Sequence, residues 1–79
     1  MEKDRRIQFI NLPYPSKLII YTLSGDVVRT LDHNDPLKGY KDWDLTSNVG
    51  QTVASGIYLF SAEDLNTNEV QTGKFVIVK

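Results

Sequence analysis

Cysteine is absent from this chain of 79 residues, so no disulfide bond and no thiolate zinc site can stabilise it. Long apolar runs are absent as well, because none approaches the roughly 18 residues that a membrane-spanning helix needs. Charged residues near Met1 precede only a short apolar stretch, which is not the pattern of a signal peptide. We therefore expect one small domain over 1–79 that does not insert into a membrane, with any export signal outside this chain.

The chain also lacks an excess of charge of one sign. Nine Lys and Arg residues oppose ten Asp and Glu residues, which leaves a formal net charge of −1. A nucleic-acid-binding domain normally concentrates Lys and Arg to displace phosphate counterions. The basic cluster of Lys3, Arg5 and Arg6 is interspersed with acidic residues, so we interpret 1–5 as a flexible, solvated lead-in. No nucleic-acid partner is expected.

Short segments with apolar residues at every second position follow one another along the chain, separated by Gly, Pro, Asn and Asp. Period two is typical of β-strands, and turn signals about every ten residues are typical of a sandwich or a barrel. Sustained helical periodicity does not occur. The strands are expected at 6–12, 17–23, 26–31, 40–45, 55–63 and 70–78.

The apolar pattern also indicates which side chains face inward. Along 17–23 the phase switches after Ile20, which predicts either a β-bulge or a strand that is buried on both faces. Gly25 is expected at the tight turn that follows, where positive φ costs glycine nothing. The inward set expected for the last two strands is Ile57, Leu59, Ala62, Phe75 and Ile77, with Tyr58 and Phe60 on the other face.

No grouping of residues supplies catalytic chemistry. The single histidine, His33, lies among Asp and Asn neighbours, but adjacent residues cannot all turn toward one ion, so we interpret this segment as a solvated loop. Asp42 and Asp44 flank Trp43 at strand spacing and are expected on a polar outer face, where a small sandwich offers no cleft for a glycosidase pair. We expect no enzymatic activity, no metal and no cofactor.

Aromatic side chains leave one alternative open. At strand spacing such side chains belong more often to the core, with tyrosine hydroxyls at its rim. Gathered on one exposed face, they would instead form a platform for a carbohydrate or a peptide. The side chains concerned are Tyr14, Tyr21, Tyr40, Trp43, Tyr58 and Phe60.

The joint spacing of Tyr21, Gly25, Trp43, Gly56 and Tyr58 resembles that of the immunoglobulin-like module of the flagellar hook-capping (FlgD) type. It is also similar to the related C-terminal sorting domains of type IX secretion cargo in the Bacteroidetes and allied phyla. The resemblance covers almost the whole chain, from about Ile7 to Val78. It implies an all-β, immunoglobulin-like β-sandwich of about seven antiparallel strands. The expected scaffold residues are Tyr21, Gly25, Val28, Trp43 and Phe75.

The two relatives imply different uses of the same fold. In sorting domains the final strands and closing lysines are recognised by the outer-membrane secretion machinery, which maps here onto Gly56, Ile57, Tyr58, Lys74 and Lys79. The Pro-Asn-Pro common near the first strand of sorting domains is replaced by Leu-Pro-Tyr-Pro at 12–15, which fits the broader hook-capping module.

The resulting expectation is a non-catalytic C-terminal module of a larger secreted bacterial protein. It would pass through the periplasm and act as a type IX sorting or cell-surface attachment signal, with the secretion machinery or neighbouring domains of the parent chain as protein partners. Two alternatives stay open. One is a structural spacer or assembly module, as in flagellar hook capping, and the other is an accessory carbohydrate-binding domain of a secreted hydrolase.

Overall fold

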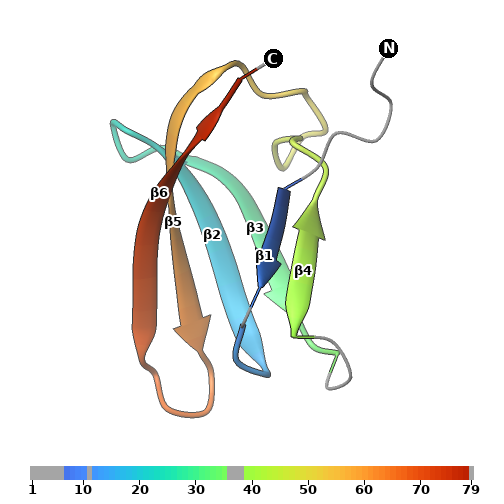
Figure 1. The fold of residues 1–79 in the computed structure, drawn as a ribbon, viewed down its shortest axis with the longest axis vertical. Helices are drawn as coiled ribbons and strands as arrows, with labels where there is room; N and C mark the ends of the chain where they lie inside the picture. Colours follow the sequence, from blue (N-terminus) through green and yellow to red (C-terminus); the bar gives the residue numbers. More distant parts are fainter. Residues whose placement is uncertain (1–6, 11, 36–38, 79) are drawn as a thin grey trace.

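Two antiparallel sheets pack as a sandwich in the computed structural model, which describes residues 7–10, 12–35 and 39–78 (Figure 1). The six strands within these ranges are β1 (Ile7–Ile10), β2 (Ser16–Thr22), β3 (Val27–His33), β4 (Tyr40–Trp43), β5 (Gly56–Asp64) and β6 (Val70–Ile77). The larger sheet has the order β3-β2-β5-β6, and the smaller one pairs β1 with β4. The predicted all-β, immunoglobulin-like sandwich is confirmed; the lead-in at 1–5 and Lys79 lie outside the described residues.

The core lies between the two sheets and is built around aromatic rings. Trp43 of β4 is 1% exposed, and its indole Nε1 donates a hydrogen bond of 2.8 Å to the carbonyl oxygen of Thr46. Phe75 of β6 contacts the Trp43 ring edge-on, with the two ring centroids 6.1 Å apart, and it also contacts Phe9 of β1. Trp43 and Phe75 therefore join the two sheets, as expected of scaffold residues. The buried apolar set is Phe9, Leu18, Ile20, Leu31, Trp43, Leu45, Val53, Tyr58, Ala62 and Ile77.

The β2–β3 hairpin confirms the expected turn, whereas the bulge beside it adds its extra residue, Val28, to β3 and not to β2. Gly25 has φ +96°, and its amide donates to the carbonyl oxygen of Thr22 at 3.0 Å. The register between the two strands shifts at Ile20 and Tyr21, as a bulge requires. Ile20 is fully buried, whereas Tyr21 is half-buried and outside the core cluster. β2 itself keeps its alternation and pairs with β5 without a shift, so Tyr21, an expected scaffold residue, lies with Leu59 on the outer face of the larger sheet.

The expected orientation of β5 is wrong for all but one of its side chains. Tyr58 and Ala62 are buried and Phe60 packs against the core, whereas Ile57 is 45% exposed. Leu59, expected inward, is only half-buried and pairs with exposed Lys74. Large rings gain more from burial than aliphatic side chains do.

The hydroxyl of Tyr58 does not prevent its burial, because it donates a hydrogen bond of 2.7 Å to the carbonyl oxygen of Ala54. Its ring stacks on Phe75 across the β5–β6 pair, with the ring centroids 6.0 Å apart. Ala62 shares this face because side chains alternate along a strand.

The interpretation of His33 as part of a solvated loop is also wrong. His33 is the last residue of β3, is 2% exposed, and pairs with buried Ser16 of β2. The ring of Tyr14 meets the imidazole edge-on, with the centroids 6.5 Å apart. β3 therefore extends two residues beyond the end expected at Leu31.

Arg29 of β3 ties the larger sheet to the connection that follows β4. Its Nη1 donates hydrogen bonds to Thr46 Oγ1 at 2.9 Å and to the carbonyl oxygen of Ser47 at 3.0 Å. Thr46 Oγ1 in turn donates to Asp44 at 2.6 Å, which holds the pKa of that carboxyl below its ordinary value. A lowered pKa in the folded state means that this contribution to stability is present near neutral pH and is lost as the pH falls through the lowered pKa.

Replacement of Arg29 by alanine is expected to lower the free energy of unfolding by about 1–3 kcal/mol, because hydrogen bonds from a charged donor are lost. Urea unfolding followed by tryptophan fluorescence measures this change. Arg29→Lys keeps the charge but not the planar fork, so its loss should be smaller. An Arg29→Ala variant that unfolds at the same urea concentration as the parent would contradict the role assigned to this side chain.

Candidate interaction surface

Four of the five residues expected to carry recognition are brought together on the β5–β6 pair. In its register Gly56 lies opposite Ile77, Ile57 opposite Val76, Tyr58 opposite Phe75, and Leu59 opposite Lys74. Ile57 and Lys74 present exposed side chains, whereas Tyr58 is buried and Gly56 half-buried. The fifth residue, Lys79, lies outside the described residues. Solvent therefore meets Ile57 and Lys74 directly, and Tyr58 supports them from the core.

An apolar strip runs across the outer face of the larger sheet beside these residues. Cross-strand partners share a face of a sheet, so Tyr21, Leu59 and Lys74 form one row and Ile57 and Val76 the next. Ile57 is 45% exposed and Val76 61% exposed, and Tyr21 and Leu59 are half-buried. We call Tyr21, Ile57, Leu59 and Val76 the outer strip. It was not predicted, because sequence reasoning had placed Ile57 and Leu59 in the core.

The outer strip borders a shallow hollow on this face. The hollow has a volume of about 430 Å³ and is lined by Tyr21, Leu59, Phe60, Ser61, Thr72, Gly73 and Lys74. The hydroxyls of Tyr21 and Ser61 lie 3.2 Å apart and share a hydrogen bond. Lys74 is the charged side chain among these lining residues. The hollow thus combines an apolar floor with hydroxyl groups and one cation.

The two edges of the larger sheet are not equivalent. At the β3 edge the side chain of Asn48 accepts a hydrogen bond of 3.0 Å from the amide of Thr30, and the Asn48 amide donates to Val28 at 2.9 Å. These bonds cap the upper part of β3. β6 pairs with β5 on one side, and no described strand pairs with it on the other. Unpaired main-chain groups on an edge strand can accept a further strand, so β6 is the edge that a partner could extend.

Gly73 lets the ring of Phe60 lie against β6. A Cβ atom at position 73 would come within 2.6 Å and 2.8 Å of two ring carbons of Phe60. Because that ring also contacts Phe9 and Phe75, it has little freedom to move away.

Replacement of Gly73 by alanine should therefore destabilise the domain by about 1–3 kcal/mol, the usual cost of overpacking a core. The matched control is Gly39→Ala, because an added Cβ there meets no atom within 4 Å and φ is not positive. Thermal unfolding of both variants checks the prediction, which fails if Gly73→Ala melts with the Gly39→Ala variant.

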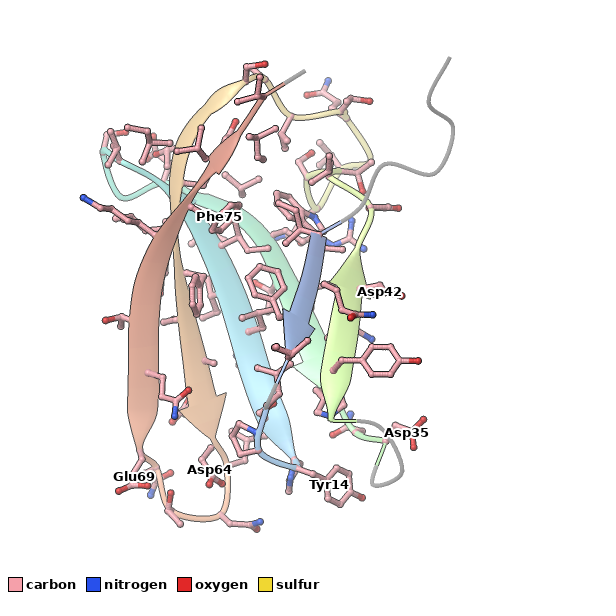
Figure 2. All side chains as sticks on the ribbon, viewed as in Figure 1. Tyr14, Asp35, Asp42, Asp64, Glu69 and Phe75 are labelled. Atoms are coloured by element: carbon pink, nitrogen blue, oxygen red, sulfur yellow. The ribbon has the colours of Figure 1, made fainter. Side chains whose placement is uncertain are left out.

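The acidic side chains that the structure describes do not form a metal site. Within the described residues no three His, Cys, Asp or Glu side chains are grouped so that they could hold an ion. Asp42 accepts a hydrogen bond of 3.2 Å from Gln8 across the β1–β4 pair, while Asp44 is bonded to Thr46. Asp64 and Glu69 lie at the β5–β6 connection, far along the molecule from Asp42 (Figure 2). We therefore assign no catalytic role to these carboxylates.

The structure does not gather the candidate aromatic platform on one face. Trp43 and Tyr58 are buried in the core. Tyr14 is 46% exposed within the β1–β2 connection, whereas Tyr21 lies on the outer face of β2 and Tyr40 begins β4. A carbohydrate partner would therefore have to bind to single rings.

Comparison with known proteins identifies a shared fold. No protein-family model matches the chain. No curated protein matches it either. A solved structure does: PorZ, described as an essential bacterial surface component of the type IX secretion system of the human oral bacterium Porphyromonas gingivalis. The match has a TM-score of 0.74 at 17% sequence identity and covers 91% of this chain.

This chain corresponds to only 9% of the length of PorZ, so it matches one small part of a much larger protein. The likeness shows that the two share a fold. None of the described residues belongs to a helix long and apolar enough to cross a membrane.

Proposed function

We propose that this chain is a non-catalytic module of a larger secreted bacterial protein and that it acts as a sorting or surface-attachment signal in type IX secretion. The observation that carries the proposal is the match over 91% of the chain to part of PorZ, a surface component of that secretion system. The resemblance of the sequence to type IX sorting domains supports it independently. The module would reach the cell surface through the periplasm, as part of its parent protein.

Recognition would use the β5–β6 side of the folded domain. The outer edge of β6 supplies main-chain donors and acceptors that a partner strand can pair with, which gives affinity independent of sequence. Ile57 and Lys74 are exposed beside that edge and supply an apolar group and a cation. These side chains would give specificity. Lys79 is proposed to contribute as well.

An export assay tests this function. Residues 1–79 are fused to the carboxyl end of a fluorescent reporter that carries a periplasmic export signal, and the fusion is expressed in a type IX-competent host. We expect the reporter at the cell surface or in the medium. A known sorting domain fused to the same reporter is the positive control. The proposal fails if the control is exported and our fusion stays in the periplasm.

A structural spacer or assembly module is the second candidate. It is favoured by the same comparison, because a segment matching 9% of PorZ is one part of a far longer chain. In that role the module would hold neighbouring domains and need no translocon. The export assay distinguishes the two roles, because a spacer would leave the reporter in the periplasm. A spacer also predicts a parent chain that carries several such sandwiches.

A further inference from the structure

We propose that the inner face of the β5–β6 hairpin is a docking groove for an extended peptide segment that carries apolar side chains at alternate positions followed by a lysine or arginine. This inference does not rest on the secretion role. It rests on a part of the larger sheet that the smaller sheet leaves uncovered and on the order of the side chains along that part.

The smaller sheet is too narrow to cover the whole inner face of the larger one. β1 and β4 lie toward β3, and no described strand lies over the lower half of β5 and β6 (Figure 1). Gln71 of β6 lies opposite buried Ala62 and therefore on the inner face, yet its side chain is exposed. The inner face of the hairpin thus meets solvent where a third strand of the smaller sheet would cover it.

A groove of about 730 Å³ marks this uncovered region. It lies between the β1–β2 connection and the β5–β6 hairpin, and its lining includes Leu12, Pro13, Ala62, Asp64, Glu69 and Gln71. β4 pairs with β1 on the side away from β5 and β6, and no described strand pairs with the other edge of β1 (Figure 1). An extended peptide beside that edge would therefore gain main-chain hydrogen bonds to β1 as well as contacts in the groove.

The side chains of the hairpin change from apolar to acidic along this face. Phe60 forms the upper row, where its ring lies against Gly73. Ala62 belongs to the next row, and the row after it holds Asp64, whose amide donates 2.8 Å to the carbonyl oxygen of Glu69. Successive rows on one face are two residues, or about 6.5 Å, apart. An extended peptide repeats its side chains at the same interval, so it presents one side chain to each row.

The acidic row selects a basic residue of the occupant. Asp64 Oδ1 accepts a hydrogen bond of 2.9 Å from the Asn66 amide, and Glu69 Oε1 lies 3.5 Å from the Thr67 hydroxyl. Neither carboxylate pairs with a lysine or arginine among the described residues, and no basic side chain lines the groove. A lysine or arginine there would meet two carboxylates, while the side chains two and four positions away contact the apolar rows. Charge complementarity therefore fixes both the composition and the direction of the peptide.

An NMR titration of the 79-residue chain, labelled with nitrogen-15, tests the proposal. The probe is the capped peptide acetyl-Ser-Val-Thr-Val-Ser-Lys-Ser-amide. We expect saturable shifts of the amides of Leu12, Ala62, Asp64 and Gln71, which weaken as salt is added. The same peptide with glutamate in place of its lysine should bind about tenfold more weakly. No saturable shift at millimolar peptide, or equal binding of the two peptides, overturns the proposal.

Two neighbouring positions of β6 provide matched variants. Gln71→Lys places a cation in the groove and should weaken binding of the lysine peptide about tenfold. Thr72→Lys adds the same charge at an exposed position on the outer face and should bind like the parent. Glu69→Gln changes only an exposed side chain and should weaken binding about threefold. Circular dichroism checks the folding of all three.

Three results would contradict this site. One is binding that neither Gln71→Lys nor Glu69→Gln weakens, and another is a set of shifts confined to the outer face of the larger sheet. The third is a shift of the groove amides as the chain alone is concentrated, which would make a second copy the occupant in place of a peptide. Peptide binding by a module that is not exported would remove the secretion role and leave this inference intact.

Discussion

Replacement of Trp43 by alanine is expected to lower the free energy of unfolding by about 3–5 kcal/mol, which is most of what a domain this small possesses. The indole is 1% exposed and contacts Phe75 of the opposite sheet, so its removal leaves a cavity between the two layers. It also leaves the Thr46 carbonyl without the indole donor that bonds it at 2.8 Å. Circular dichroism against temperature should show a chain that is largely unfolded at 37 °C.

Trp43→Phe separates the two contributions. Phenylalanine retains most of the ring volume but cannot donate to Thr46, so its cost should be less than half that of Trp43→Ala. A cooperative melt of Trp43→Ala close to that of the parent would mean that this side chain is not central to the core.

Replacement of Phe75 by alanine is expected to be nearly as damaging, at about 3 kcal/mol or more. Its ring contacts rings on three other strands: Phe9 of β1, Trp43 of β4, and Tyr58 and Phe60 of β5. Loss of one ring therefore loosens the contact of both sheets at once.

The matched control for Phe75 is its neighbour in β6. Val76 is 61% exposed on the outer face, so Val76→Ala should change stability by less than about 0.5 kcal/mol. Denaturant unfolding of the two variants tests the alternation of β6 directly. Equal losses at the two positions would contradict the assignment of Phe75 inward and Val76 outward.

The parts of the fold that follow from local chemistry could be predicted from sequence. Gly25 adopts positive φ at the expected turn. Phe75 and Ile77 alternate with Val76 as expected, because only one face of β6 is covered. In each case a single residue type or a simple alternation has one stable solution.

The orientation of β5 could not be predicted in this way. Ile57, Tyr58, Leu59 and Phe60 are all apolar, so period two does not distinguish the two faces. The choice is made by the partner strand, because Tyr58 lies opposite Phe75 and stacks on it. One local clue existed: Ala62 shares the parity of Tyr58 and Phe60, and cannot face the core together with Ile57.

His33 illustrates a second limit of sequence reasoning. Its neighbours Asp32 and Asn34 are polar and exposed, so the segment has the composition of a loop. Alternation continues through it nevertheless, because Leu31 and His33 share the buried face and Ser16 of β2 pairs with His33. The prediction of a loop followed the polar composition, whereas the alternation of buried and exposed residues indicates the strand.

The sequence predicted which strands carry the candidate surface, but not which face of the sheet its side chains occupy. The resemblance placed recognition at Gly56, Ile57, Tyr58 and Lys74, and the structure gathers these on adjacent strands. Only the structure shows that Ile57 joins Tyr21, Leu59 and Val76 on the outside of the sheet, since that grouping depends on long-range register. The same register places Tyr58 on the opposite face, in the core.

The most direct test of the secretion role is the exported fraction of a reporter fused to three versions of this module in a type IX-competent host. The versions are the parent, Lys74→Gln, and Lys17→Gln as a control at another exposed lysine of the same face. We predict that the parent and Lys17→Gln are exported alike and that Lys74→Gln is retained in the periplasm, although all three melt at similar temperatures. Retention of the parent, in cells that export a known sorting domain, would contradict the proposed function.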